Sequence, residues 1–143
     1  MLFAMDELQK NDSHFPTPLL HLTYLLQQSS DELLTSGVGA GLSSVRVMSA
    51  LHPRVARSQL VVAKMLRQTE SSVSRQLHNM KKQGLVTVTK NKKDGRQRDV
   101  TLTAKGHRTF VKAKKLLDKQ QKSLSKSDQK ALEQTAGKVL RAI

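Results

Sequence analysis

The 143-residue chain carries 25 Lys and Arg against 11 Asp and Glu, and this formal net charge of +14 predicts a polyanionic partner. It has no cysteine, which excludes disulfides, thiolate zinc ligands and redox sensing through a thiol. The length suits one compact domain. The charge is uneven, because residues 1–36 hold one base and five acids whereas residues 54–108 hold fourteen bases and three acids, so we expect a local basic surface.

The first third of the chain predicts two helices. Leucines recur at roughly helical spacing over residues 18–34, which indicates an amphipathic helix that begins at a proline. The three glycines within residues 37–41 are interpreted as a linker. Ser43 or Ser44 then caps a short helix, which ends at His52-Pro53.

The middle of the chain predicts two tandem helices followed by a β-hairpin. Ser58 and Thr69 are each placed to cap a helix, and only a brief turn separates the two helices. Residues 85–89 have the β-branched content of a strand, Asp94-Gly95 is a strong hairpin signal, and residues 100–102 suit the returning strand. This order is typical of a helix-turn-helix extended by a two-stranded wing.

Two more helices complete the chain. Thr103 caps a long helix, and Ser125 or Ser127 opens the last one. We therefore expect a chain that is mainly α-helical with a small β-wing.

The long helices at both ends of the chain carry more apolar side chains than one small core needs. We interpret residues 1–143 as a single chain, with a winged helix-turn-helix part at 42–102 and dimerisation helices at 16–36 and 104–143. An alternative is that these helices close a monomeric core. Because a core this small leaves the long end helices little to cover, we expect a two-fold homodimer. Such a dimer would set the second tandem helices of the two subunits about one duplex turn apart. The residues expected at the dimer interface are Leu19, Leu22, Leu26, Phe110, Leu117, Leu124, Leu132, Val139 and Ile143.

The second tandem helix has one apolar face and one polar face. At 100° per residue, Leu77 and Met80 lie within about 40° of Val73, and the opposite face is short, polar and cationic. Arginine can fork onto guanine edges, and small polar residues let a helix approach a groove floor. A solvated helix face carries the same residue types, so this helix alone does not decide between the two interpretations. Its candidate DNA-binding residues are Ser71, Ser72, Ser74, Arg75, His78, Asn79 and Lys82.

The predicted wing is rich in cations. Five Lys or Arg residues fall within nine positions of the hairpin, where they could follow a phosphate backbone or enter a narrow minor groove. The alternative is a solvated turn whose lysines prevent edge-to-edge strand pairing. The candidate DNA-binding residues of the wing are Lys90, Lys92, Lys93, Asp94, Arg96 and Arg98.

These segments together resemble the MarR-type family, the multiple-antibiotic-resistance regulators. The resemblance runs through residues 62–66, 71–75 and 81–86 and is strongest at Asp94-Gly95-Arg96, followed by Leu102-Thr103-Ala104-Lys105-Gly106. The segments follow the family pattern in order and without gaps. The resemblance implies that Asp94 braces the wing, that Arg96 enters the minor groove, and that the helix from Thr69 reads the major groove.

The sequence departs from the family pattern at two places. The turn between the tandem helices usually has a glycine and then an apolar residue, but here it has Arg67 and Gln68. The position two places after the Leu-Val pair is usually basic, but here it is occupied by Val88. These departures concern the turn geometry and one backbone contact.

The sequence offers no candidate for a catalytic or metal site. The five histidines are scattered, and there is no phosphate-cradling glycine loop, nucleophile elbow or pair of clustered carboxylates. We therefore expect no enzymatic activity, no metal and no cofactor. The longest stretch without Asp, Glu, Lys or Arg, residues 13–30, contains two prolines, and the first residues lack a signal-peptide pattern, so we expect a cytoplasmic protein with no membrane partner.

The family resemblance implies a sequence-specific regulator of transcription that binds double-stranded DNA as a homodimer at a pseudo-palindromic operator. Repression, and release by a small-molecule effector of unknown identity, are further implications of the resemblance. A charge of +14 also suits a non-specific architectural or RNA-binding protein, although three Phe and one Tyr leave few side chains to stack on bases. A protein-interaction module that keeps the winged fold without binding DNA is a third hypothesis.

Overall fold

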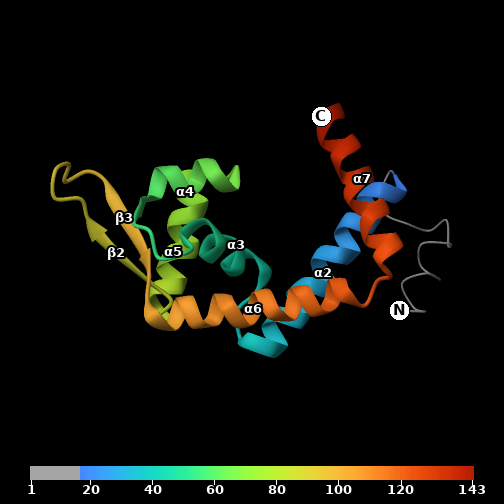
Figure 1. The fold of residues 1–143 in the computed structure, drawn as a ribbon. Coiled ribbons are helices and arrows are strands. Elements are labelled where there is room, and N and C mark those ends of the chain that lie inside the picture. Colours follow the sequence, from blue (N-terminus) through green and yellow to red (C-terminus); the bar gives the residue numbers. More distant parts are fainter. Residues whose placement is uncertain (1–16) are drawn as a thin grey trace.

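Six helices and a small three-stranded antiparallel sheet make up the part of the chain that the computed structural model describes, residues 17–143 (Figure 1). The expected fold class, mainly α with a small β-wing, is confirmed. The predicted helix at 16–36 begins one residue outside this part. In chain order, the elements are α2 (Pro18–Val38), α3 (Leu42–Leu51), β1 (Arg57–Ser58), α4 (Gln59–Leu66), α5 (Glu70–Lys82), β2 (Val86–Lys90), β3 (Arg98–Leu102), α6 (Ala104–Lys122) and α7 (Lys126–Ala142).

Helix α2 runs further than the leucine pattern predicts. It includes Gly37 and ends at Val38, and its C-cap residue Gly39 has a left-handed φ of 70°. The linker predicted from the glycines is therefore wrong at Gly37, and the connection to α3 is only three residues long. Gly37 lies against α6, and a Cβ there would collide with the side chain of Leu116. Gly37 thus lies at a close contact between two helices rather than at a break in the chain, and a larger residue there would require the Leu116 side chain to move.

Helix α3 is capped by a residue from another helix. The predicted caps Ser43 and Ser44 are wrong, because the helix begins at Leu42 and its N-cap residue is Gly41, which has no side chain to offer. Asp31 of α2 accepts a hydrogen bond from the Leu42 amide at 2.7 Å. A carboxylate at a helix N-terminus satisfies a free N–H group and favours the helix dipole.

The remaining helix starts follow local capping rules. The side chains of Ser58, Thr69, Thr103 and Ser125 each accept a hydrogen bond from a backbone N–H in the first turn of α4, α5, α6 and α7. These four predictions are confirmed, and Ser125, not Ser127, opens the last helix.

The sheet has one strand more than the sequence predicts. Arg57 and Ser58 form β1, which pairs with β3 opposite Val100 and Asp99, so the strand order is β1-β3-β2. A two-residue strand is too short to show a period of two in the sequence. On the other edge of β3, the register joins Val88 to Val100 and Lys90 to Arg98.

The core lies where α3, α4, α5 and the sheet meet the first half of α6. It contains Val47, Met48, Leu77 and Leu102, each at most 1% exposed, and Phe110 of α6 is buried among such side chains. Phe110 lies 4.9 Å from His52, measured between ring centroids. Phe110, expected at a dimer interface, is thus packed by its own chain.

Helix α7 differs from the others because none of its residues is buried. Figure 1 shows it at the far end of α6, beside the start of α2 and away from the sheet. Leu132, Leu140 and Ile143 are 48%, 71% and 90% exposed. No helix in residues 17–143 is long and apolar enough to cross a membrane.

Candidate nucleic-acid interface

Helix α5 is held in place by one apolar face and by a polar cap at its start. Val73, Leu77 and Met80 are each at most 1% exposed and face the core. At the N-terminus, the hydroxyl of Thr69 accepts a hydrogen bond from the amide of Ser72 at 3.2 Å. Burial and capping together fix the rotation of the helix about its axis, and therefore which side chains point outward.

The opposite face of α5 is polar and open to solvent. All of its candidate residues are exposed except Ser72, which is half-buried. Ser74, Arg75, His78 and Asn79 line one surface depression of about 410 Å³. This polar face of α5 offers one guanidinium and several short donors and acceptors on a rigid helix, the combination that can bond base edges and phosphates.

The turn between the tandem helices is made without a glycine. Arg67 ends α4 in the left-handed conformation, with φ of 53° and ψ of 43°, and its amide bonds back to the carbonyls of Ala63 and Lys64. Arginine thus replaces the glycine that is usual in this turn, but the left-handed C-cap geometry is kept. The arginine adopts a backbone conformation that favours glycine.

The wing turn is organised by two side-chain oxygens, one from the Asn91 amide and one from the Asp94 carboxylate. Oδ1 of Asn91 accepts hydrogen bonds from the amides of Lys93 and Asp94 at 2.8 and 3.0 Å, and Oδ1 of Asp94 accepts one from the amide of Arg96 at 3.0 Å. The amide of Gln97 also donates to the Asp94 carbonyl at 3.0 Å. These bonds define the path of the chain between the two strands, so the cationic side chains project from an ordered turn.

Asp99 is a second residue that organises the wing, and it is not among the residues predicted from the sequence. Its two oxygens accept hydrogen bonds from Asn91 at 2.8 Å and from Gln97 at 2.9 Å, across the base of the turn. The Asn91 side chain was also missed, although an asparagine two residues before a turn amide is a known turn signal. The partnership with Asp99 depends on strand register, which the sequence does not show.

The cationic side chains of the wing lie around this hydrogen-bonded turn. Lys90 and Arg98 are opposite each other in the register, and all five candidate bases of the wing are exposed. Lys90, Lys92 and Lys93 line a depression of about 450 Å³ together with Thr89, Asn91 and Asp99. The wing therefore presents a dense positive surface on an ordered hairpin, beside a rigid polar helix.

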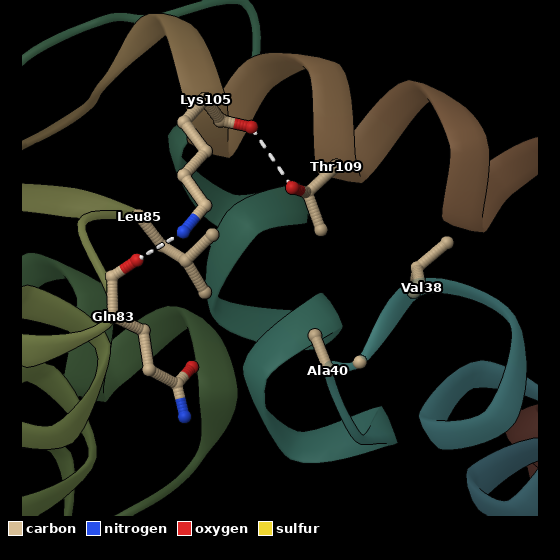
Figure 2. A pocket seen from close by; sticks show the side chains of 7 residues that line it. Val38, Ala40, Gln83, Leu85, Lys105 and Thr109 are labelled. Carbon is tan, nitrogen blue, oxygen red and sulfur yellow. Dashed lines mark hydrogen bonds between the residues drawn. The ribbon is translucent and has the colours of Figure 1, made fainter.

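A compact junction ties the end of α5 and the wing to α6. The Thr103 hydroxyl donates to the Gly84 carbonyl at 2.6 Å and accepts from the Gly106 amide at 2.9 Å. Lys105 donates to the Gln83 carbonyl at 2.8 Å (Figure 2). Gly106 packs so close to Leu85 that a Cβ would collide with its carbonyl oxygen. This junction fixes both strands of the wing relative to α6.

Histidine side chains do not form a metal centre in the described part of the chain. His52 and His107 stack with ring centroids 5.4 Å apart and an interplanar angle of 9°. Within residues 17–143, no group of three or more His, Asp or Glu is placed to hold a metal ion.

Comparisons with known proteins agree with this geometry. Residues 41–97, which include α3 to the wing turn, match the model of the MarR family. No curated protein matches the chain.

Solved structures with the same fold include DNA-bound and ligand-bound proteins. A mutant MarR from E. coli complexed with operator DNA has a TM-score of 0.71 at 22% identity, over 86% of this chain and 94% of that one. The transcriptional repressor CouR bound to a 23-mer DNA duplex has a TM-score of 0.71 at 22% identity, over 85% and 92%. The PcaV regulator from Streptomyces coelicolor in complex with its natural ligand has a TM-score of 0.66 at 22% identity, over 85% and 91%. At this identity, the likeness concerns the fold.

Proposed function

Because residues 41–97 match the model of the MarR family, we propose that the chain is a MarR-type transcription regulator that binds double-stranded DNA in a sequence-specific manner. The observation that carries the proposal is the polar face of α5, rigidly held beside a cationic wing turn. A helix that reads bases needs a fixed orientation, and a wing that binds phosphates needs a fixed path. Both conditions hold here.

The two parts of the surface have different roles in this proposal. Helix α5 lies in the major groove, where Arg75 bonds a guanine edge and its polar neighbours contact bases or phosphates. The wing lies along the backbone, and Arg96 enters the adjacent minor groove. Asp94 and Asn91 act as positioning residues because they hold the turn that presents the wing cations.

A homodimer is the second part of the proposal. Leu19 and Leu26 of α2 are 49% and 53% exposed, and the apolar side chains of α7 are also uncovered in the single chain. A two-fold partner would bury these side chains and so remove the apolar surface of both end helices from water, which is favourable. A two-fold pair of α5 helices would favour a pseudo-palindromic operator.

Repression with release by a small ligand is the third part. In support, relatives of the same fold include a transcriptional repressor bound to DNA and a regulator bound to its natural ligand. A ligand that binds better to a dimer with a different spacing of its α5 helices would lower the affinity for DNA by population shift. In this proposal the chain works by binding, not by catalysis.

The test separates base reading from backbone binding. Arg75→Ala should weaken binding to a selected duplex by about 1–3 kcal/mol and relax the preference at one base pair, because the loss falls on a base contact. Arg96→Ala should weaken binding to selected and random duplexes about equally. Arg141→Ala, which removes the same charge from the exposed end of α7, is the matched control.

Affinities for both duplexes measured by fluorescence anisotropy at about 150 mM salt decide the outcome. If neither Arg75→Ala nor Arg96→Ala differs from Arg141→Ala, these side chains do not contact DNA and the proposal fails. If all duplexes bind equally and binding vanishes with rising salt, the protein is a non-specific architectural one.

A further inference from the structure

Helix α6 carries a regular row of basic side chains that DNA reading by α5 and the wing does not use. Its 19 residues include seven Lys or Arg and a single acid, Asp118. Six of the seven recur at alternating spacings of three and four residues along the whole helix. This basic stripe consists of Lys105, Arg108, Lys112, Lys115, Lys119 and Lys122.

The spacing places the stripe on one side of α6. At 100° per residue, its six positions fall within about 100° of one another. Gly106, Phe110 and Ala113, which are buried, lie on the opposite side of the same helix. All six residues of the basic stripe are exposed in the single chain. The stripe therefore faces outward, away from the core and from the half-buried Leu117 that continues the apolar face.

A stripe of like charges needs a physical reason. Basic residues three and four positions apart on a helix are neighbours and repel, whereas a solvated helix gains from alternating acids and bases. Helix α7 shows the mixed pattern, with Asp128 and Glu133 among its bases. The stripe lacks that compensation except for Asp118. The expectation of a basic surface confined to the centre of the chain is thus too narrow, because nine more bases and three acids follow residue 108.

Charge and shape favour the backbone of a DNA duplex as the occupant. The stripe extends over about 26 Å at 1.5 Å per residue, and it is a narrow band of single charges along one side of the helix. Duplex DNA presents a comparable row of phosphates, with one charge per 3.4 Å along each strand. An amphipathic helix that enters a membrane surface needs a free apolar face. The apolar face of α6 is already packed into the core.

The stripe leads away from the DNA-reading surface. Its first residue, Lys105, bonds the carbonyl of Gln83, directly after the end of α5. From there, α6 runs toward α7, away from the wing tip (Figure 1). A duplex seated on α5 and the wing tip therefore leaves the far part of the stripe uncovered.

We propose that the basic stripe of α6 binds the phosphate backbone of a second DNA duplex, so that one protein molecule holds two DNA segments together. The proposal goes beyond the proposed function and rests on it, because the first segment is bound by α5 and the wing. The second contact needs no base reading, and it depends strongly on salt.

A two-duplex capture assay tests the proposal. The full-length protein is bound to a bead-immobilised duplex at about 100 mM salt, and retention of a second, labelled duplex of unrelated sequence is measured. Lys112→Gln, Lys115→Gln and Lys119→Gln combined form the stripe variant. Lys114→Gln, Lys130→Gln and Lys138→Gln remove the same charge from exposed positions outside the stripe and form the matched control.

The wild type and the matched control should retain the second duplex, and the stripe variant should retain at least tenfold less while still binding the bead. Removing three phosphate contacts should also lower the slope of log affinity against log salt for the second duplex by about 2.7. Helix content by circular dichroism should be equal in all three proteins, since glutamine and lysine have similar helix propensity.

Three results would overturn the proposal while leaving the proposed function intact: equal capture by the stripe variant, no second duplex on a protein that binds the bead, or stripe-dependent retention of phosphatidylserine vesicles in place of duplex. If the wild type does not bind even the bead duplex, the proposed function itself fails, and the bridging proposal fails with it.

Discussion

Replacing Thr103 by alanine should destabilise the protein more than its small volume suggests. The hydroxyl of Thr103 makes two hydrogen bonds, one from the Gly106 amide at the start of α6 and one to the Gly84 carbonyl after α5. One side chain thus caps a helix and fastens the end of another. The alanine variant loses both bonds at once.

The two bonds set the expected magnitude. Loss of a threonine N-cap costs about 1 kcal/mol. Loss of a hydrogen bond to a backbone carbonyl costs about 0.5–1.5 kcal/mol. Because Gly84 is exposed, water can replace the lost donor, and the total loss in the free energy of unfolding should be about 2 kcal/mol. For a chain of this length, that corresponds to a fall in Tm of about 4–8 °C.

Urea unfolding followed by circular dichroism measures this loss directly. Thr103→Val keeps the side-chain shape but lacks the hydroxyl, so its free energy of unfolding should fall as much as that of Thr103→Ala. Thr103→Ser keeps the hydroxyl, so its free energy of unfolding should stay within about 0.5 kcal/mol of the wild type. All variants are compared at one protein concentration, because association adds to apparent stability. Equal stability of the serine and alanine variants would refute the role given to this hydroxyl.

Three further substitutions test other parts of the structure. Gly106→Ala should cost about 1–3 kcal/mol in thermal melts because its Cβ meets the Leu85 carbonyl, whereas Gly95→Ala, with open space around it, should melt like the wild type; equal melting of the two would contradict the packing. Arg67→Gly should gain about 0.5–1 kcal/mol in urea unfolding by relieving the left-handed backbone, and Arg67→Ala should not; a gain shared by alanine would point to the side chain instead. Leu132→Glu should lower the mass in sedimentation equilibrium from dimer to monomer by placing a charge in the proposed interface; an unchanged dimer mass would remove Leu132 from that interface.

Features that depend on neighbouring residues could be predicted from the sequence. The four caps at Ser58, Thr69, Thr103 and Ser125 involve bonds within three residues, so the local pattern contains all the necessary information. The polar face of α5 follows in the same way from the helical period, because the buried residues fix the orientation of the others.

Features that depend on distant partners could not be predicted. The cap of α3 comes from Asp31, eleven residues before the amide it binds, and Gly37 packs against a leucine on α6. Strand β1 exists because β3 offers it a free edge. The role of Asp99 in the wing likewise depends on the register of the hairpin. In each case the partner is set by the tertiary fold.

The most direct test of the central claim is selection of binding sites from randomised duplex DNA by the purified protein at about 150 mM salt, where non-specific binding is suppressed. A dimeric regulator that reads bases with the polar face of α5 should enrich an inverted repeat, with half-sites about one helical turn apart. Failure to enrich any sequence, with binding lost as salt rises, would contradict the claim.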